Sequence, residues 1–140
     1  MPDSFIKYRS GYKYQLDEDY KIQINIKPQK GVDEKFIKLD QVGNLIVVAG
    51  YAWDGPSGPV IDTKENMRAS LVHDALYQLM RHGKLTQKQH KDAADKLFKK
   101  ICIEDGVSSS IAHAYYLGLK VGGKPATDPK NKKAIKRAPA

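Results

Sequence analysis

The spacing of the hydrophobic residues changes once along the chain. In the first fifty residues they alternate singly with polar residues, as at Tyr20, Ile22 and Ile24, which is typical of strands with one buried face. Beyond residue 63 they recur every three or four positions, the period of a helix with one buried stripe. Strands followed by helices predict an α+β fold.

Two antiparallel hairpins are expected in the N-terminal part, which gives about four strands. The first hairpin joins segments 12–16 and 20–26. The second joins 36–39 and 45–50 through the Gly-Asn pair at 43–44, whose residue types tolerate positive φ in a tight turn. Alternation within these segments implies that each strand has one wet face.

Polar capping residues mark the start of each expected helix. Asp62 with Glu65 has the spacing of a capping box, and Thr86 with Gln89 repeats that spacing. The serines at 108–110 predict the start of a third helix. The chain is therefore expected to form three helices.

Each helix is expected to bury one apolar stripe. The first should run to Gly83, and the third should stop at the glycines 122–123. The core-facing residues, one group for each helix in chain order, are predicted to be Val72, Ala75, Leu76 and Leu79; Ala94, Leu97, Phe98 and Ile101; and Ile111, Ala114, Tyr115 and Leu119.

The composition fits one compact domain, expected over residues 1–123. The chain has 140 residues, of which 41% are hydrophobic, enough to bury a core without a metal or a disulfide. Cys102 is the single cysteine, so no disulfide can form within the chain. We find no leader-like start and no apolar run of about 20 residues, so we expect folding in a reducing cytosol and no transmembrane segment.

A basic C-terminal tail is expected over residues 124–140. It holds six lysines and arginines against one aspartate, which gives +5 of the net charge of +8. Such a tail is either a solvated, flexible terminus or an arm that docks on an acidic protein partner or on nucleic acid.

His73 and Tyr77 are the first candidates for chemistry. They lie about 40° apart around the first helix, beside its buried stripe. Asp95 has the same relation to the stripe of the second helix, and a short connection favours an antiparallel helix pair. We therefore predict that His73 donates a hydrogen bond to Asp95. A histidine oriented by a buried carboxylate is the arrangement of a general base.

Asp74 is expected to point to another side of the helix, towards the loop at 51–63. Prolines and glycines interrupt both periods in that loop. One carboxylate with several loop carbonyls is a ligand set of the calcium type, because hard cations take oxygen ligands. The alternative is a proline-stiffened connection in which Asp54 and Ser57 cap local backbone groups.

The string HDALY at 73–77, with an Ala-Asp pair ending at Asp95, resembles the helix pair of phospholipase A2 enzymes. It resembles in particular the compact, disulfide-free domain of parvovirus capsid proteins, and the resemblance covers residues 51–98. It implies that His73 is the general base and Asp95 its orienting carboxylate. It also implies that Tyr77 is a hydrogen-bond partner of Asp95.

The same resemblance implies a calcium site. The carboxylate ligand would be Asp74. Three backbone carbonyls from the preceding loop would complete the set, those of Trp53, Gly55 and Ser57. Calcium is thus the cofactor that the resemblance implies.

Over most of its length the chain is also similar to a phage and prophage family of small proteins without assigned function. The matching strings are GYAWDGPSGPVIDT and, after it, MRASLVHDALYQLMR. This resemblance implies a phage protein that is made in the host bacterial cytoplasm and becomes a component of the virion. Its expected partners are other virion proteins, a phospholipid membrane, and nucleic acid through the basic tail.

Two functions therefore remain open. In one, the protein is a calcium-dependent hydrolase of phospholipid esters. In the other, the same residues form a buried polar network in a structural capsid, neck or tail protein.

His82, His90 and His113 form no recognisable ligand set with His73, and Cys102 is expected to be a small buried hydrophobe.

Overall fold

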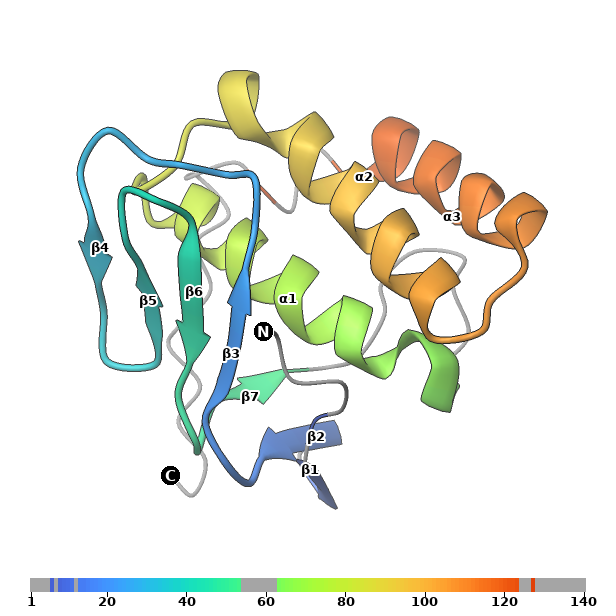
Figure 1. Cartoon of the computed structure of the whole chain (residues 1–140), viewed down its shortest axis with the longest axis horizontal. Helices are drawn as coiled ribbons and strands as arrows, with labels where there is room; N and C mark the ends of the chain where they lie inside the picture. Colours follow the sequence, from blue (N-terminus) through green and yellow to red (C-terminus); the bar gives the residue numbers. More distant parts are fainter. Residues whose placement is uncertain (1–5, 7, 12, 54–62, 124–126, 128–140) are drawn as a thin grey trace. The chain divides into compact units, whose positions relative to one another are not determined.

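The computed structural model describes residues 6, 8–11, 13–53, 63–123 and 127, with the backbone alone for 8–11 and 13. Within these residues, seven strands precede three helices (Figure 1). The strands lie in one compact unit and the helices in a second. The α+β fold is confirmed, and the described strands number seven rather than about four.

The strands form two antiparallel sheets. One has the order β1-β2-β7, built from β1 (Tyr8–Gly11), β2 (Lys13–Leu16) and β7 (Ala52–Trp53). The other has the order β3-β6-β5-β4, built from β3 (Tyr20–Gln23), β4 (Val32–Asp33), β5 (Ile37–Leu39) and β6 (Asn44–Val47). The expected alternation is present, since Tyr20 and Ile22 of β3 are buried and the residues between them are exposed.

The predicted first hairpin is wrong. β2 pairs with β1 and β7, whereas β3 pairs with β6 in the other sheet. The Asp19 carboxylate, between β2 and β3, accepts a hydrogen bond from the Ala49 N–H at 2.8 Å. Leu16 N–H donates to the Tyr51 carbonyl, also at 2.8 Å. These two bonds attach the end of β2 and the segment after it to residues 49–51, which follow β6. The chain therefore passes from one sheet to the other instead of forming a hairpin.

The predicted second hairpin is confirmed. β5 pairs with β6 in the register Leu39↔Leu45, and Gly43 in the turn has a φ of 90°. A Cβ at Gly43 would also collide with the Ile24 carbonyl oxygen, so the turn requires glycine for two independent reasons.

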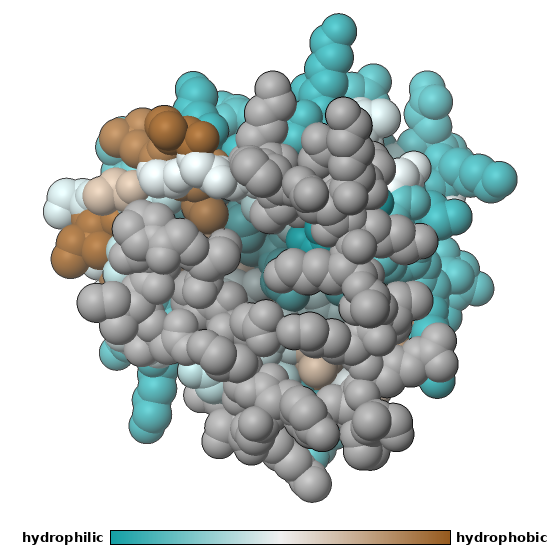
Figure 2. Space-filling model, turned by 180° about the vertical axis from the view of Figure 1, so that it is seen from behind, coloured by the Kyte–Doolittle hydropathy of each residue, from teal (hydrophilic) through white to brown (hydrophobic). Residues whose placement is uncertain are grey.

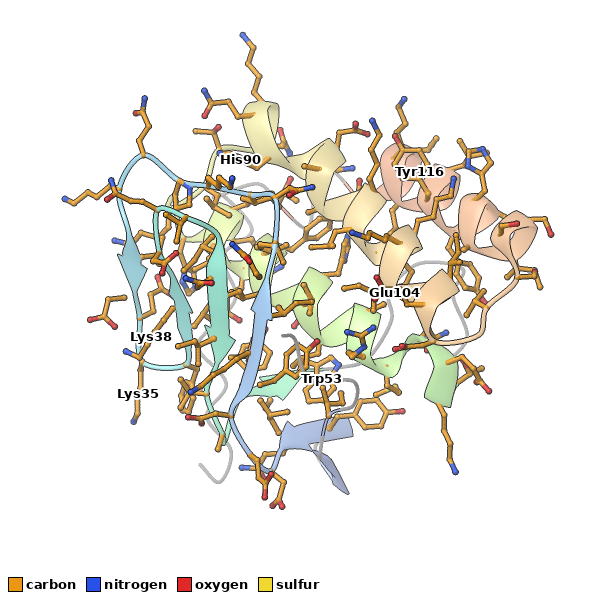
Figure 3. All side chains as sticks on the ribbon, viewed as in Figure 1. Lys35, Lys38, Trp53, His90, Glu104 and Tyr116 are labelled. Atoms are coloured by element: carbon orange, nitrogen blue, oxygen red, sulfur yellow. The ribbon has the colours of Figure 1, made fainter. Side chains whose placement is uncertain are left out.

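The helical unit contains α1 (Lys64–Arg81), α2 (Gln87–Glu104) and α3 (Ser109–Gly122). α2 packs against both α1 and α3, and it runs antiparallel to α1 (Figure 1). Arg68, near the start of α1, donates to Glu104 at 2.8 Å and to Asp105 at 2.9 Å. Figure 3 labels Glu104 at the end of α2. This ion-pair cluster fixes the start of α1 to the end of α2. None of the described helices is both long enough and apolar enough to cross a bilayer.

The helix caps differ partly from the prediction. Asp62 lies outside the described residues, and the residue that caps α1 is Thr63, whose N–H donates to Asn66 Oδ1 at 3.0 Å. The Thr86 hydroxyl donates to the Gln89 side chain at 3.0 Å rather than capping the backbone. Ser108 caps α3 as predicted, since its hydroxyl accepts the Ile111 N–H.

The predicted stripe of α1 is buried throughout, and that of α2 is buried except for the half-buried Leu97. The predicted stripe of α3 is confirmed at Leu119 and wrong at its other three positions. Ile111 and Ala114 are exposed and Tyr115 is half-buried. The buried face consists of Ala112, Tyr116 and Leu119. α3 has apolar residues on almost every side, so the hydrophobic period alone does not select the face that packs.

Candidate functional site

His73 on α1 and Asp95 on α2 are in direct contact, as predicted. The distance from His73 Nε2 to Asp95 Oδ1 is 2.7 Å. Both residues are buried, with exposed fractions of 4% and 0%. The contact follows from the antiparallel packing of the two helices, because it places the rim of one stripe against the rim of the other.

Two more donors reach the same carboxylate. The Tyr77 hydroxyl donates to Asp95 Oδ1 at 2.5 Å, which confirms this predicted contact. The Lys91 ammonium donates to Asp95 Oδ2 at 2.7 Å and to the Leu119 carbonyl on α3 at 2.9 Å. The network therefore links all three helices through one carboxylate.

The sequence interpretation did not include Lys91. The signal was its spacing, since Lys91 and Asp95 are four residues apart on α2 and such pairs face each other on a helix. What the spacing cannot show is that the lysine side chain is only 12% exposed and that it reaches α3.

Hydrogen bonding decides the charge of Asp95. Burial alone would raise the pKa of Asp95, because it disfavours the charged form. The hydrogen bonds from His73, Lys91 and Tyr77 act in the opposite direction, and the pKa of Asp95 is lowered overall. The carboxylate is therefore ionised at neutral pH.

Tyr77 is held in its neutral form. Its burial, and next its hydrogen bond to the Asp95 carboxylate, raise the pKa of the Tyr77 hydroxyl far above its ordinary value. A neutral tyrosine can donate to Asp95 over the whole physiological pH range. The ring also packs on His73, with the two ring centroids 4.0 Å apart.

The His73 ring is fixed from two sides. Tyr77 packs on it from the same helix, and the Phe98 ring meets it edge-on from α2 at a centroid distance of 5.3 Å. Within the described part of the chain, the ring forms its hydrogen bond through Nε2 alone. Because Asp95 is ionised, Nε2 carries the proton and donates it, which leaves a lone pair on Nδ1 of the neutral ring.

The predicted calcium ligands are only partly described. Asp74 is half-buried on α1, directly after His73, and Trp53 is buried in β7. Gly55 and Ser57 lie outside the described residues, so the predicted convergence of carbonyls on Asp74 stays a prediction. Among the described residues, no cluster of three or more His, Cys, Asp or Glu side chains could hold a metal ion. A site with one carboxylate and several carbonyls would not form such a cluster.

The remaining candidate side chains lie outside the network. Cys102 is fully buried, as predicted, and burial followed by the nearby Asp105 raises the pKa of its thiol to about 12. The Lys99 ammonium donates to His113 Nδ1 at 3.1 Å on the exposed side of α3. His90, labelled in Figure 3, lies near the start of α2, and burial lowers its pKa.

One residue of the predicted tail is described. Thr127 is fully buried, and its hydroxyl accepts a hydrogen bond from the Gln87 side chain at the start of α2. At this position the chain packs on the helical unit, so Thr127 is not part of a solvated terminus. The other residues of 124–140 lie outside the described part.

Comparison with curated proteins and with solved structures finds no match. A family model does match, over residues 31–119, which is well over half of the 140 residues and extends from before β4 into α3. His73, Asp74, Tyr77 and Asp95 all fall within this span. The chain belongs to DUF1353, a family described as proteins of unknown function.

Proposed function

We propose that this protein hydrolyses an ester bond of phospholipids, with His73 as the general base. The observation that carries the proposal is the 2.7 Å contact between His73 Nε2 and an ionised, fully buried Asp95. A histidine held in this way is positioned to accept a proton through Nδ1. The resemblance of the HDALY helix and its Asp95 partner to phospholipase A2 enzymes supports the substrate class.

In the proposed reaction, His73 Nδ1 takes a proton from a water molecule while the water oxygen bonds to the ester carbonyl carbon. The bond from that carbon to the alcohol oxygen then breaks. The proton on Nδ1 passes to the leaving alcohol oxygen, so the products are a fatty acid and a free hydroxyl. Asp95 stabilises the transient imidazolium and keeps the ring in the reactive tautomer, and Tyr77 keeps Asp95 in place.

The chemistry of the donors fits a calcium ion. Asp74 would supply the carboxylate, and the carbonyls of Trp53, Gly55 and Ser57 would supply neutral oxygens, which are ligands that calcium prefers. When bound, calcium would polarise the ester carbonyl and favour negative charge on its oxygen.

We further propose a phage origin and a place in the virion. The support is the similarity of the loop and of α1 to phage and prophage proteins. Other virion proteins, the lipid of a host membrane and nucleic acid are then the proposed partners, and the host bacterial cytoplasm is the proposed site of synthesis.

Fatty-acid release tests the proposal. The full chain is incubated with phospholipid vesicles, with millimolar calcium or with a chelator. We expect release with calcium and none with the chelator. Absence of release at millimolar calcium would contradict the enzymatic proposal.

A second candidate function is a structural one, and the observation that favours it is Lys91. Lys91 and His73 both bond to the Asp95 carboxylate, and Lys91 also donates to the Leu119 carbonyl on α3. A network that links three helices stabilises a fold whether or not it reacts, and His73 is only 4% exposed. If the network is only structural, Lys91→Met and His73→Gln should both lower the free energy of unfolding, and the wild-type chain should release no fatty acid at millimolar calcium.

A further inference from the structure

The outer face of α3 is apolar and exposed. Ile111, Leu117 and Val121 have exposed fractions of 49%, 47% and 86%. Figure 2, seen from behind, shows apolar residues in brown gathered at the upper left, on the side where α3 lies after the half turn. With Ala114, which is exposed, and Gly118, which is half-buried, these residues form what we call the outer face of α3. At 100° per residue this face lies about 180° from the buried residues Ala112, Tyr116 and Leu119.

The outer face has the spacing of a helix-pairing seam. Ile111, Ala114, Gly118 and Val121 are separated by three, four and three residues, which is the spacing of core positions in paired helices. The two larger residues lie at the ends and the two smallest in the middle. Small residues at the centre allow two helices to approach closely.

This pattern is its own complement. In an antiparallel pair of α3 helices with a two-fold axis at the level of Tyr116, Ile111 of one copy meets Val121 of the other. Ala114 then meets Gly118, and Leu117 lies beside Leu117 of the second copy across the axis. An interface between identical surfaces requires such matching, because each contact must occur twice.

The charges on α3 favour a second copy over a charged partner. Lys120 is the only lysine, arginine, aspartate or glutamate in α3, and it lies about 120° from the centre of the outer face. The outer face therefore offers no charge to an acidic protein, to nucleic acid or to an anionic membrane. An apolar face without charged residues brings no like charges into contact when it pairs with its own copy.

We infer that the outer face of α3 is the interface of a two-fold symmetric dimer of this chain. The inference does not depend on the proposed enzymatic function. A helix of 14 residues is about 21 Å long. The outer face offers five residues from each copy, against roughly 20–30 residues a side in a standard interface, so the paired helices form a small interface. The dimer should therefore dissociate reversibly on dilution.

Sedimentation of the full chain over a dilution series tests this inference. We expect a monomer–dimer equilibrium that high salt does not weaken, since no ion pair holds the interface. Val121→Glu should raise the dissociation constant at least about tenfold, because two carboxylates would be buried in an apolar seam. The control is Val42→Glu in the turn before β6, where the valine is also exposed, at 56% against 86% for Val121. This change should alter the dissociation constant by less than about twofold. A monomer at all concentrations, or a dimer unaffected by Val121→Glu, would overturn the inference.

Cross-linking tests the two-fold geometry separately. Leu117→Cys places the two thiols about 3 Å apart along the helix axes, whereas Val121→Cys places them about 15 Å apart. A short bifunctional thiol reagent should therefore link Leu117→Cys into dimers and leave Val121→Cys unlinked. The native Cys102 is fully buried and does not compete for the reagent. Equal linking of both variants, or linking of Val121→Cys alone, would contradict the antiparallel arrangement.

Discussion

The Asp95 carboxylate lies 2.7 Å from the His73 ring through Oδ1, and its other oxygen is bonded to an ammonium group. Asp95 is fully buried, and a buried charge is tolerated only when it is paired and hydrogen-bonded. His73, Tyr77 and Lys91 provide those partners from α1 and α2. The stability of the helical unit and the proposed chemistry therefore depend on the same group.

Replacing Asp95 by asparagine tests that dependence. Asp95→Asn keeps the shape and removes the charge, which leaves the largely buried Lys91 without its counter-ion. We expect unfolding in urea to require about 2–4 kcal/mol less free energy. The control is Asp92→Asn on the same helix, where the carboxylate is 54% exposed and bonds to Lys96 and to the Tyr116 hydroxyl. That change should cost less than about 1 kcal/mol, and equal losses in the two variants would mean that the buried network adds no stability.

Tyr77→Phe should change the response to alkaline pH. Burial, followed by the bond to Asp95, raises the pKa of Tyr77, so the folded chain keeps this proton when the unfolded chain loses it. The contribution of Tyr77 to stability is complete below about pH 10 and is lost progressively above it. Above about pH 10, the free energy of unfolding of wild type should therefore fall more steeply with pH than that of Tyr77→Phe. At neutral pH the variant should be less stable than wild type by about 1 kcal/mol.

Urea unfolding at several alkaline pH values provides the measurement. The pKa of Cys102 is also raised, to about 12, and it acts in the same direction in both proteins. The quantity to compare is therefore the slope of unfolding free energy against pH, wild type against Tyr77→Phe. Identical slopes would mean that Tyr77 ionises as readily in the folded chain as in the unfolded one.

Gly123→Ala should disturb the network from outside. A Cβ at Gly123 would lie 2.5 Å from the Tyr77 hydroxyl oxygen and 2.6 Å from the Leu119 carbonyl oxygen. Such crowding costs about 1–3 kcal/mol. The neighbouring Gly122 is the control, because a Cβ there meets no atom within 4 Å. Gly122→Ala should be neutral or stabilising by up to about 1 kcal/mol, as for alanine in a helix, and thermal melts that rank the two variants in the opposite order would contradict this packing.

The sequence predicts the order of elements well because hydrophobic period depends on local geometry alone. It predicts the second hairpin for the same reason, since the Gly43 turn joins adjacent segments. It fails where partners are distant in the sequence. β3 alternates as a hairpin strand would, but alternation does not reveal that its partner is β6 rather than β2. The prediction of which face of α3 is buried fails for a different reason, because a helix that is apolar on almost every side has no single stripe to detect.

The candidate site shows the same division. His73, Tyr77 and Asp95 are predictable because helical spacing and one short connection place them together. Lys91 requires knowledge of how α3 approaches, since one of its two bonds is to the Leu119 carbonyl. Its spacing from Asp95 is an ordinary surface pattern, and only the third helix makes the pair part of a buried network.

Asp74→Asn should weaken calcium binding and leave the proposed general base, His73, unchanged. It removes the single side-chain charge from the proposed ligand set, so calcium should bind more weakly. We expect the calcium concentration for half-maximal fatty-acid release to rise at least about tenfold, with a similar maximal rate. Unchanged calcium dependence would refute the assignment of Asp74 and leave that of His73 intact.

The rate of fatty-acid release by His73→Gln at saturating calcium tests the central claim most directly. His90→Gln is the matched control, since His90 lies on α2 outside the Asp95 network. The account predicts that His73→Gln lowers the rate at least about 100-fold, the usual contribution of a general base, with an unchanged circular dichroism spectrum, and that His90→Gln stays within about twofold of wild type. A His73→Gln protein that releases fatty acid at the wild-type rate would contradict it.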